Sequence, residues 1–227
     1  WGTVAVIAVA LYLGAVVRLH TRGDKWSVGR TLCWILGWAF FIWATCGAPG
    51  VFGRFSFSWH MILHMVVAMV VPIFLVLAAP ITLVARTEST RKDGTYGPRE
   101  IVLGIVHSKY TAAWANPIVA AINFSGSLIL FYYTPFFELA LTTHTGHVLM
   151  IVHFLLAGYL FCMVLVGTDP GPRKWAPSLR LVVLFVTISF HAFFGVAMMS
   201  TNTLLAEGFF GIVDVPWVPD KLADQAM

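Results

Sequence analysis

Five long runs of the sequence contain no Asp, Glu, Lys or Arg, and this feature restricts the fold more than any other. The runs cover residues 31–53, 55–85, 110–137, 139–168 and 181–206, and a sixth, shorter run covers residues 1–17. Each of the five exceeds the roughly 18–20 residues that a helix needs to cross a hydrocarbon core of about 30 Å. The composition agrees, because 11% of the 227 residues are charged, against about 25% in a typical soluble domain.

The runs show no alternation of polar and apolar residues, so helices rather than strands are expected to cross the bilayer. We predict an all-α integral membrane protein, a bundle of about six transmembrane helices in one membrane domain. The predicted spans are about 2–19, 31–47, 59–84, 116–134, 145–167 and 179–200. Pro72 and Pro80 fall inside the third span and should bend its inner half. Because the chain begins without methionine, we interpret it as truncated at the N-terminus.

The basic residues predict the orientation in the membrane. With the N-terminus outside, the cytoplasmic connections 18–30, 86–109 and 168–180 hold twelve of the fourteen Lys and Arg residues, and only Arg54 and Lys221 lie on the other side. Short cytoplasmic loops carry such an excess of basic residues, so both termini are predicted to be outside. The formal net charge of +4 therefore reflects topology, and no nucleic-acid partner is predicted.

Six of the eight histidines fall toward the predicted outer ends of three spans. They are His60 and His64 in the third span, His144, His147 and His153 in the fifth, and His191 in the sixth. Ionisable side chains inside a membrane are costly and usually mark a functional site. A single histidine in a helix more often forms a hydrogen bond to a neighbouring helix, so the prediction depends on the shared depth of the group.

Methionines accompany these histidines on the same helical faces. In the third span, His60, Met61, His64 and Met65 share an arc of about 140° at 100° per residue. Imidazole and thioether together form a ligand set suited to copper, and thioethers favour Cu(I). Histidine alone would also admit zinc, so the methionines carry the preference for copper.

The other two spans show the same combination. His147, Met150 and His153 cover about 120° of the fifth helix, and His191 lies one heptad before Met198. The sequence shows no nucleophile motif, no phosphate-binding loop and no paired acids within the spans, so no enzyme activity is predicted.

The third span carries the most specific motif. Residues 57–65 read Phe-Ser-Trp-His-Met-Ile-Leu-His-Met, followed by Pro72 and by Leu-Ala-Ala-Pro at 77–80. Together with Pro-Phe-Phe-Glu at 135–138, Phe-Leu-Leu-Ala-Gly at 154–158, Gly-Thr-Asp-Pro at 167–170 and His-Ala-Phe-Phe-Gly at 191–195, the chain resembles the CtaG-type cytochrome c oxidase assembly proteins of bacteria. It departs from their pattern at Tyr132-Tyr133-Thr134 and at Ile151, where many members have histidine.

The resemblance implies a function in the maturation of haem–copper oxidases, with delivery of copper to the catalytic subunit. It implies oxidase subunits, the lipid bilayer and other copper chaperones as partners, and the bacterial plasma (inner) membrane as the location. In some members a copper-resistance D-like membrane domain precedes this part in the same polypeptide, which agrees with a chain that begins at Trp1.

We therefore predict a copper-handling assembly factor. Cu(I) is expected to be held by His60 and His64 with Met61 or Met65, and by His153 or His147 together with His191. Three alternatives stay open: a metal-free accessory subunit of an oxidase, a membrane protein with b-type haem between histidines such as His64 and His191, and a copper importer.

Overall fold

The computed structural model describes residues 1–88, 96–171, 175–212, 215–218 and 220–227, and the regular structure of these residues is entirely helical. Within them, five helices are long and apolar enough to cross a membrane, and a bent pair of helices would make a sixth span. The chain is therefore an all-α, multi-pass membrane protein, which confirms the prediction from the charge-free runs.

The long helices lie where the spans were predicted, with ends that differ by at most three residues. The first two are α1 (Gly2–Thr21) and α2 (Val28–Cys46), and the last two are α11 (His144–Val166) and α12 (Pro177–Met199). The third span consists of α4 (Phe57–Met65), the π-helical turn η1 (Val66–Val70), α5 (Val71–Leu77) and α6 (Pro80–Thr87). The fourth is α9 (Pro117–Tyr132), which meets α10 (Phe136–Thr142) at 72°.

Several short helices lie outside the predicted spans. They are α3 (Ala48–Phe52), α7 (Pro98–Val106), α8 (Lys109–Trp114), the π-helical turn η2 (Glu207–Gly211) and α13 (Lys221–Gln225). The pattern of charges did not predict them, because none is long enough to cross the bilayer. Together with α10, the segments α3, η2 and α13 cover one end of the bundle.

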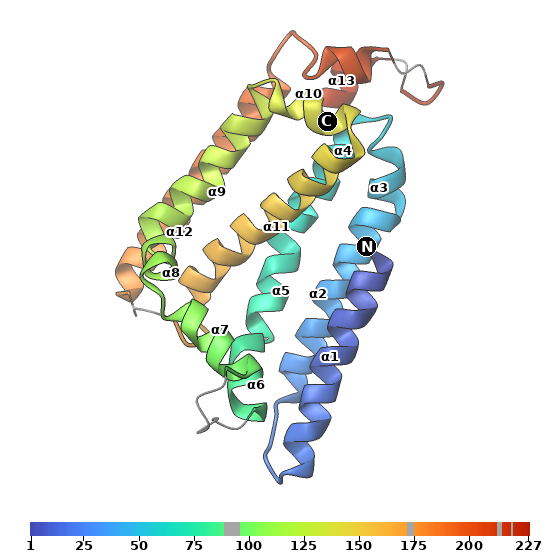
Figure 1. Ribbon diagram of the computed structural model, residues 1–227. Coiled ribbons are helices and arrows are strands. Elements are labelled where there is room, and N and C mark those ends of the chain that lie inside the picture. The colour runs from blue at the N-terminus through green and yellow to red at the C-terminus, as the bar shows by residue number, and fades with distance from the viewer. Residues whose placement is uncertain (89–95, 172–174, 213–214, 219) are drawn as a thin grey trace.

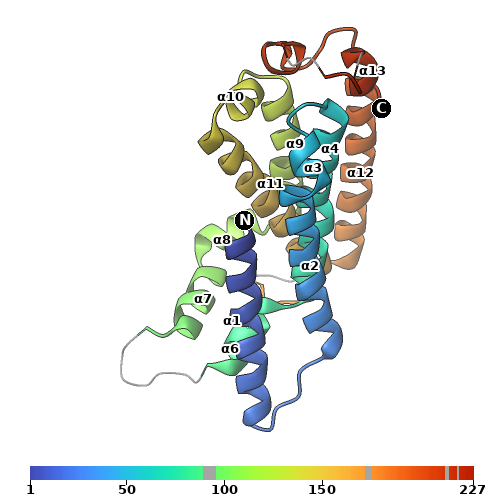
Figure 2. The same cartoon turned by 90° about the vertical axis from the view of Figure 1, so that its right-hand side faces the viewer.

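The third span and α11 form the centre of the bundle (Figure 1). On one side α2 packs against α5, with α1 beside α2; on the other side α11 packs against α9, with α12 beside α9. Figure 2 shows the same arrangement from the side, with α10 and α13 at one end and α6 at the other. The least covered helices expose large apolar side chains such as Leu11, Phe185 and Phe193, as expected for surfaces that face lipid.

The basic connections gather at the opposite end from α10 and α13. There Arg18 forms an ion pair with Glu88, and Nη2 of Arg86 lies 3.3 Å from Oδ1 of Asp24. The guanidinium of Arg22 also donates to the carbonyl of Thr87 at 2.5 Å. The charge distribution predicts that this end faces the cytoplasm, and we refer to the other end as the outer end.

The third span is broken at Ala79, in the inner half where its prolines predicted a bend. Ala79 has left-handed backbone angles (φ 51°, ψ 55°), and Pro80 begins α6. Asp169 caps this new helix, because its carboxylate accepts hydrogen bonds from the backbone N–H groups of Ile81 and Thr82 at 3.2 and 2.8 Å. A capped second helix start compensates the hydrogen bonds lost at the break.

Gly158 allows α11 to approach the third span closely. A Cβ atom at this position would lie 1.9 Å from the carbonyl oxygen of Ala68 and 2.9 Å from Cγ of Pro72. The replacement Gly158→Ala is therefore expected to lower the free energy of unfolding by about 1–3 kcal/mol or more, because backbone atoms cannot yield to the added methyl group. Thermal unfolding of the detergent-solubilised protein measures the change.

Gly126→Ala is the matched control for this variant. Gly126 lies within α9, and nothing lies within 4 Å of an added Cβ. Alanine in a helix is favoured over glycine by roughly 0.5–1 kcal/mol, so this variant should be as stable as the parent or more so. Equal stability of the Gly158→Ala protein would contradict the close approach.

Candidate functional site

Two histidines lie one helical turn apart near the outer end of α4. Ser56 caps this helix, and its hydroxyl accepts a hydrogen bond from the backbone N–H of Trp59 at 3.4 Å. His60 and His64 then fall on the same face, where they are 1% and 3% exposed. Their Nε2 atoms lie 2.9 Å apart, so the protonated one of the two donates a hydrogen bond to the lone pair of the other.

The start of α4 is held by Asp224 of α13. The Asp224 side chain is 4% exposed, and its carboxylate accepts hydrogen bonds from the backbone N–H of Phe57 at 2.6 Å and from the hydroxyls of Ser56 and Ser58 at 2.8 and 2.6 Å. A negative charge at a helix N-terminus is stabilised by the helix dipole. Asp224 thereby fixes the turn that carries His60. No sequence pattern indicated this contact, since Asp224 lies 167 residues from Phe57.

His147 joins this pair from the first turn of α11. One ring nitrogen from each of His60, His64 and His147 lies within 4.8 Å of the other two. The ring centroid of His147 is 5.8 Å from that of His60 and 6.4 Å from that of His64. We call these residues the three-histidine site, and they are the group with metal-ligand spacing among the described residues.

The geometry of the site is close to that needed for one metal ion. Imidazole nitrogens bind metals at about 2.0–2.1 Å, so two ligands of one ion are at most about 4.2 Å apart. Nitrogens within 4.8 Å of one another, with the Nε2 atoms of His60 and His64 at 2.9 Å, are near this range.

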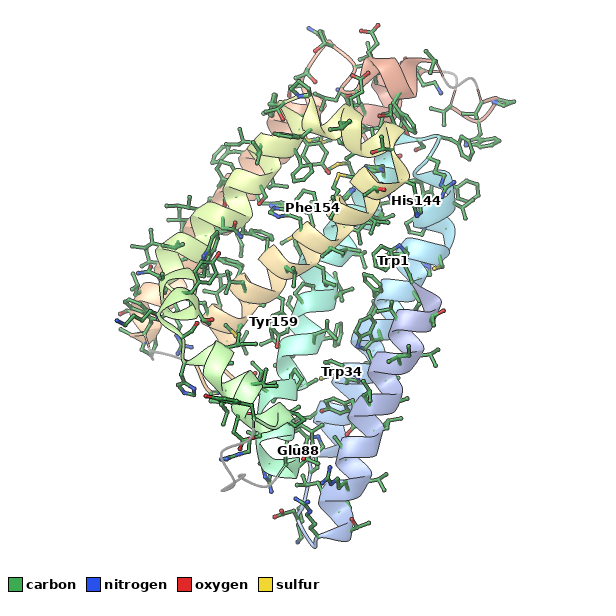
Figure 3. All side chains as sticks on the ribbon, viewed as in Figure 1. Trp1, Trp34, Glu88, His144, Phe154 and Tyr159 are labelled. Atoms are coloured by element: carbon green, nitrogen blue, oxygen red, sulfur yellow. The ribbon has the colours of Figure 1, made fainter. Side chains whose placement is uncertain are left out.

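Aromatic rings enclose two of the three histidines. Phe137 and Phe210 lie 5.5 and 6.0 Å from His60 between ring centroids, and Phe154 lies 5.0 Å from His64 with an edge-to-face orientation. Figure 3 shows His144 near the outer end of α11 and Phe154 farther along the same helix toward the inner end. The histidines therefore lie in largely apolar surroundings, in which neutral ligands are much cheaper to bury than charged ones.

A cavity of about 430 Å³ connects the three-histidine site to the outer end of the bundle. Its lining includes Arg54 from the outer loop, His60 from α4, and His144 and His147 from α11. The predicted site residues His60 and His147 thus line a cavity wide enough for a hydrated ion or a small ligand. His144 also lines this cavity, but it does not belong to the group with metal-ligand spacing.

The predicted ligands Met65 and His191 form a second group. The Nε2 atom of His191 in α12 lies 3.1 Å from Sδ of Met65. Both residues line a small cavity of about 30 Å³ together with Met61, Met198 and His64. We call this space the methionine cavity. His64 is therefore common to both groups, as a member of the three-histidine site and as a wall of the methionine cavity.

His153 lies apart from both groups. Its Nε2 atom is 2.7 Å from the hydroxyl of Ser127 in α9, and its ring packs against Phe131 with centroids 5.5 Å apart. His153 does not line the methionine cavity or the outer cavity. In this structure its contacts are those of a histidine that links two helices, so of the two predicted ligands on α11 the geometry favours His147.

Comparison with known proteins identifies a family for this chain. The model of the family described as cytochrome c oxidase caa3 assembly factor matches residues 10–227 of the chain. No solved structure matches.

Curated relatives come from mycobacteria. An uncharacterised protein of Mycobacterium leprae is 37% identical over 225 residues, and uncharacterised proteins of Mycobacterium bovis and Mycobacterium tuberculosis are each 36% identical over the same length. These matches cover 99% of this chain but 34% of each relative. The chain thus spans about a third of the length of the curated relatives that it matches.

Proposed function

Because the chain belongs to the cytochrome c oxidase caa3 assembly factor family, we propose that it binds Cu(I) at the three-histidine site and transfers it to a haem–copper oxidase during assembly. The observation that carries the proposal is the convergence of His60, His64 and His147 from two helices, with nitrogens within 4.8 Å. Their position beneath a cavity at the outer end gives the ion a route in and out.

The surroundings favour Cu(I) over divalent ions. The three histidines are neutral ligands, and no carboxylate belongs to the described group with metal-ligand spacing. A site of neutral ligands keeps the full charge of the ion in apolar surroundings, and the cost of burying a charge rises steeply with its size. A single positive charge is therefore the least costly cargo, and the nearby thioethers favour Cu(I) further.

In this proposal the residues of the chain exchange ligands and carry out no covalent step. His60 and His147, at the outer cavity, receive the ion from a copper chaperone and release it to the oxidase subunit. His64, behind them, completes the site from within the bundle. Release requires that the affinity of this site for Cu(I) is lower than that of the oxidase site that receives the ion. The proposed location is the bacterial plasma membrane, and no enzymatic activity is proposed.

The alternatives have different structural consequences. The His60–His64 hydrogen bond is also what a metal-free accessory subunit would contain. A b-type haem between His64 and His191 is disfavoured, because the cavity that both residues line has a volume of about 30 Å³, whereas pockets for organic ligands of that size take about 300–1,000 Å³. A copper importer would need further ligands along a path to the inner end, where α6 lies. The group with metal-ligand spacing lies near the outer end instead, which disfavours an importer.

Elemental analysis of the purified chain, before and after addition of Cu(I), tests the proposal. The expected result is at least one equivalent of Cu(I) per chain that survives gel filtration, with no Soret band in the absorption spectrum. A clean preparation that retains no copper under these conditions would leave the metal-free accessory subunit as the better description.

A further inference from the structure

In the proposal above no ion occupies the methionine cavity, although His64 of the three-histidine site also lines it. Three of the eight methionines, Met61, Met65 and Met198, line it. They come from two different helices, α4 and α12. Met198 is 2% exposed, and Sδ of Met65 already lies 3.1 Å from the Nε2 atom of His191.

Residues that line the same cavity carry buried polar atoms without a hydrogen-bond partner. Among the described residues seven such side-chain atoms occur, and three of them belong to residues that line the methionine cavity: Nδ1 of His64, Nδ1 of His191 and the hydroxyl oxygen of Tyr132. A buried polar atom without a partner is energetically costly, so native proteins keep few of them, and those they keep often mark a bound water or ion.

From these observations we propose that the methionine cavity is a second Cu(I) site, with Met65, His191 and Met198 as ligands and His64 as the residue it shares with the three-histidine site. The proposal rests on the proposed function, because it assumes that the cargo reaches the three-histidine site first. It extends that function from one site to two sites in series.

The size and chemistry of the cavity restrict what it can hold. A cavity needs roughly 10–15 Å³ to hold one water, so about 30 Å³ admits an ion with at most one or two waters and excludes organic ligands. Thioether and imidazole are soft, neutral ligands that suit Cu(I), whereas magnesium, calcium and manganese prefer carboxylates and carbonyls. No Asp or Glu lines the cavity.

His64 provides the connection between the two sites. Its Nε2 atom lies 2.9 Å from Nε2 of His60, which lines the outer cavity, and His64 itself lines the methionine cavity. A Cu(I) ion that leaves His60 and His147 gains Met65, His191 and Met198, with His64 bound during the exchange. The ion keeps its charge and oxidation state, and neutral imidazoles neither release nor take up a proton in this step. When both sites are filled, His64 ligates only the ion at the three-histidine site, and Met65, His191 and Met198 hold the other ion.

The test replaces the thioethers without changing the volume of the cavity. In the full chain, Met65→Leu/Met198→Leu removes two sulfur ligands, and exchange of methionine for leucine is among the best tolerated changes in a core. Met69→Leu is the matched control, because Met69 lies on η1 beside these residues but does not line the cavity. The readouts are the copper content under a competing Cu(I) chelator and the sulfur scattering in X-ray absorption spectra at the copper edge.

Two equivalents of Cu(I) are expected for the parent and for Met69→Leu, with copper–sulfur scattering in both. The Met65→Leu/Met198→Leu protein should retain one equivalent, ligated by nitrogen alone. If the parent binds one equivalent with nitrogen ligands and the double variant behaves identically, the second site is refuted and the proposed function stands. If the parent binds no copper, the proposed function itself fails.

Discussion

Replacement of His60 and His64 together by alanine is expected to remove the copper bound at the three-histidine site. Loss of a residue that only supports a metal ligand already costs about 10–100-fold in affinity, so loss of two of three ligands should lower the affinity by more than about 100-fold. The measurement is the retained Cu(I) after gel filtration, together with the activity of the co-expressed oxidase in membranes.

His153→Ala is the matched control for this experiment. It removes an imidazole from the outer half of α11. This imidazole forms a hydrogen bond with Ser127 and not with the other histidines. The control should keep the copper content of the parent and support oxidase maturation. Should the His60→Ala/His64→Ala protein retain the copper of the parent and mature the oxidase equally well, the proposed function would be refuted.

Replacement of Asp224 by alanine is expected to have the second largest effect. Three donors, the backbone N–H of Phe57 and the hydroxyls of Ser56 and Ser58, lose their buried acceptor. Each donor that stays buried without its acceptor costs about 1–3 kcal/mol, so the variant should be destabilised by at least that amount. A lower temperature of thermal unfolding, together with weaker Cu(I) retention, is the expected result, since the same turn carries His60.

Asp220→Ala is the control that separates loss of the Asp224 hydrogen bonds from unfolding of α13, the helix that carries Asp224. Asp220 caps α13 by accepting hydrogen bonds from the N–H groups of Leu222 and Ala223, both at 3.0 Å, and its side chain is exposed. Loss of a helix cap costs about 1 kcal/mol. Similar losses of stability in the two variants would show that Asp224 has no special role in holding α4.

The spans could be predicted from the sequence because the bilayer tolerates few charges and requires internal hydrogen bonding. The predicted spans therefore end within three residues of the observed helix ends, as at α11 and α12. The helices α3, α10 and α13 are too short to cross the bilayer, so this constraint does not determine them. Contacts such as Asp224 with Phe57 depend on how the whole chain folds back, which no local pattern contains.

The site could be predicted in part for a related reason. The spacing of His60 and His64 places them on one helical face regardless of the rest of the fold. Helical periodicity also places His147 and His153 on one side of α11, but it does not say at which depth α11 crosses α4. The close approach at Gly158 sets that depth, and it brings His147 rather than His153 to the pair. The division between the three-histidine site and the methionine cavity depends on the same packing.

The π-helical turn η1 has a consequence for how sequence changes act on this span. A π-helical turn contains about one residue more than an α-helical turn, and each residue rotates the chain by about 100°. The face that carries His60 and His64 is therefore offset from the faces of α5 by one residue's rotation. Loss of a single residue within 66–70 would straighten the turn and rotate both histidines relative to α11, although every ligand would still be present. For this span, the length of the segment between the site and Pro72 is as much a determinant of ligand geometry as the identity of the ligands.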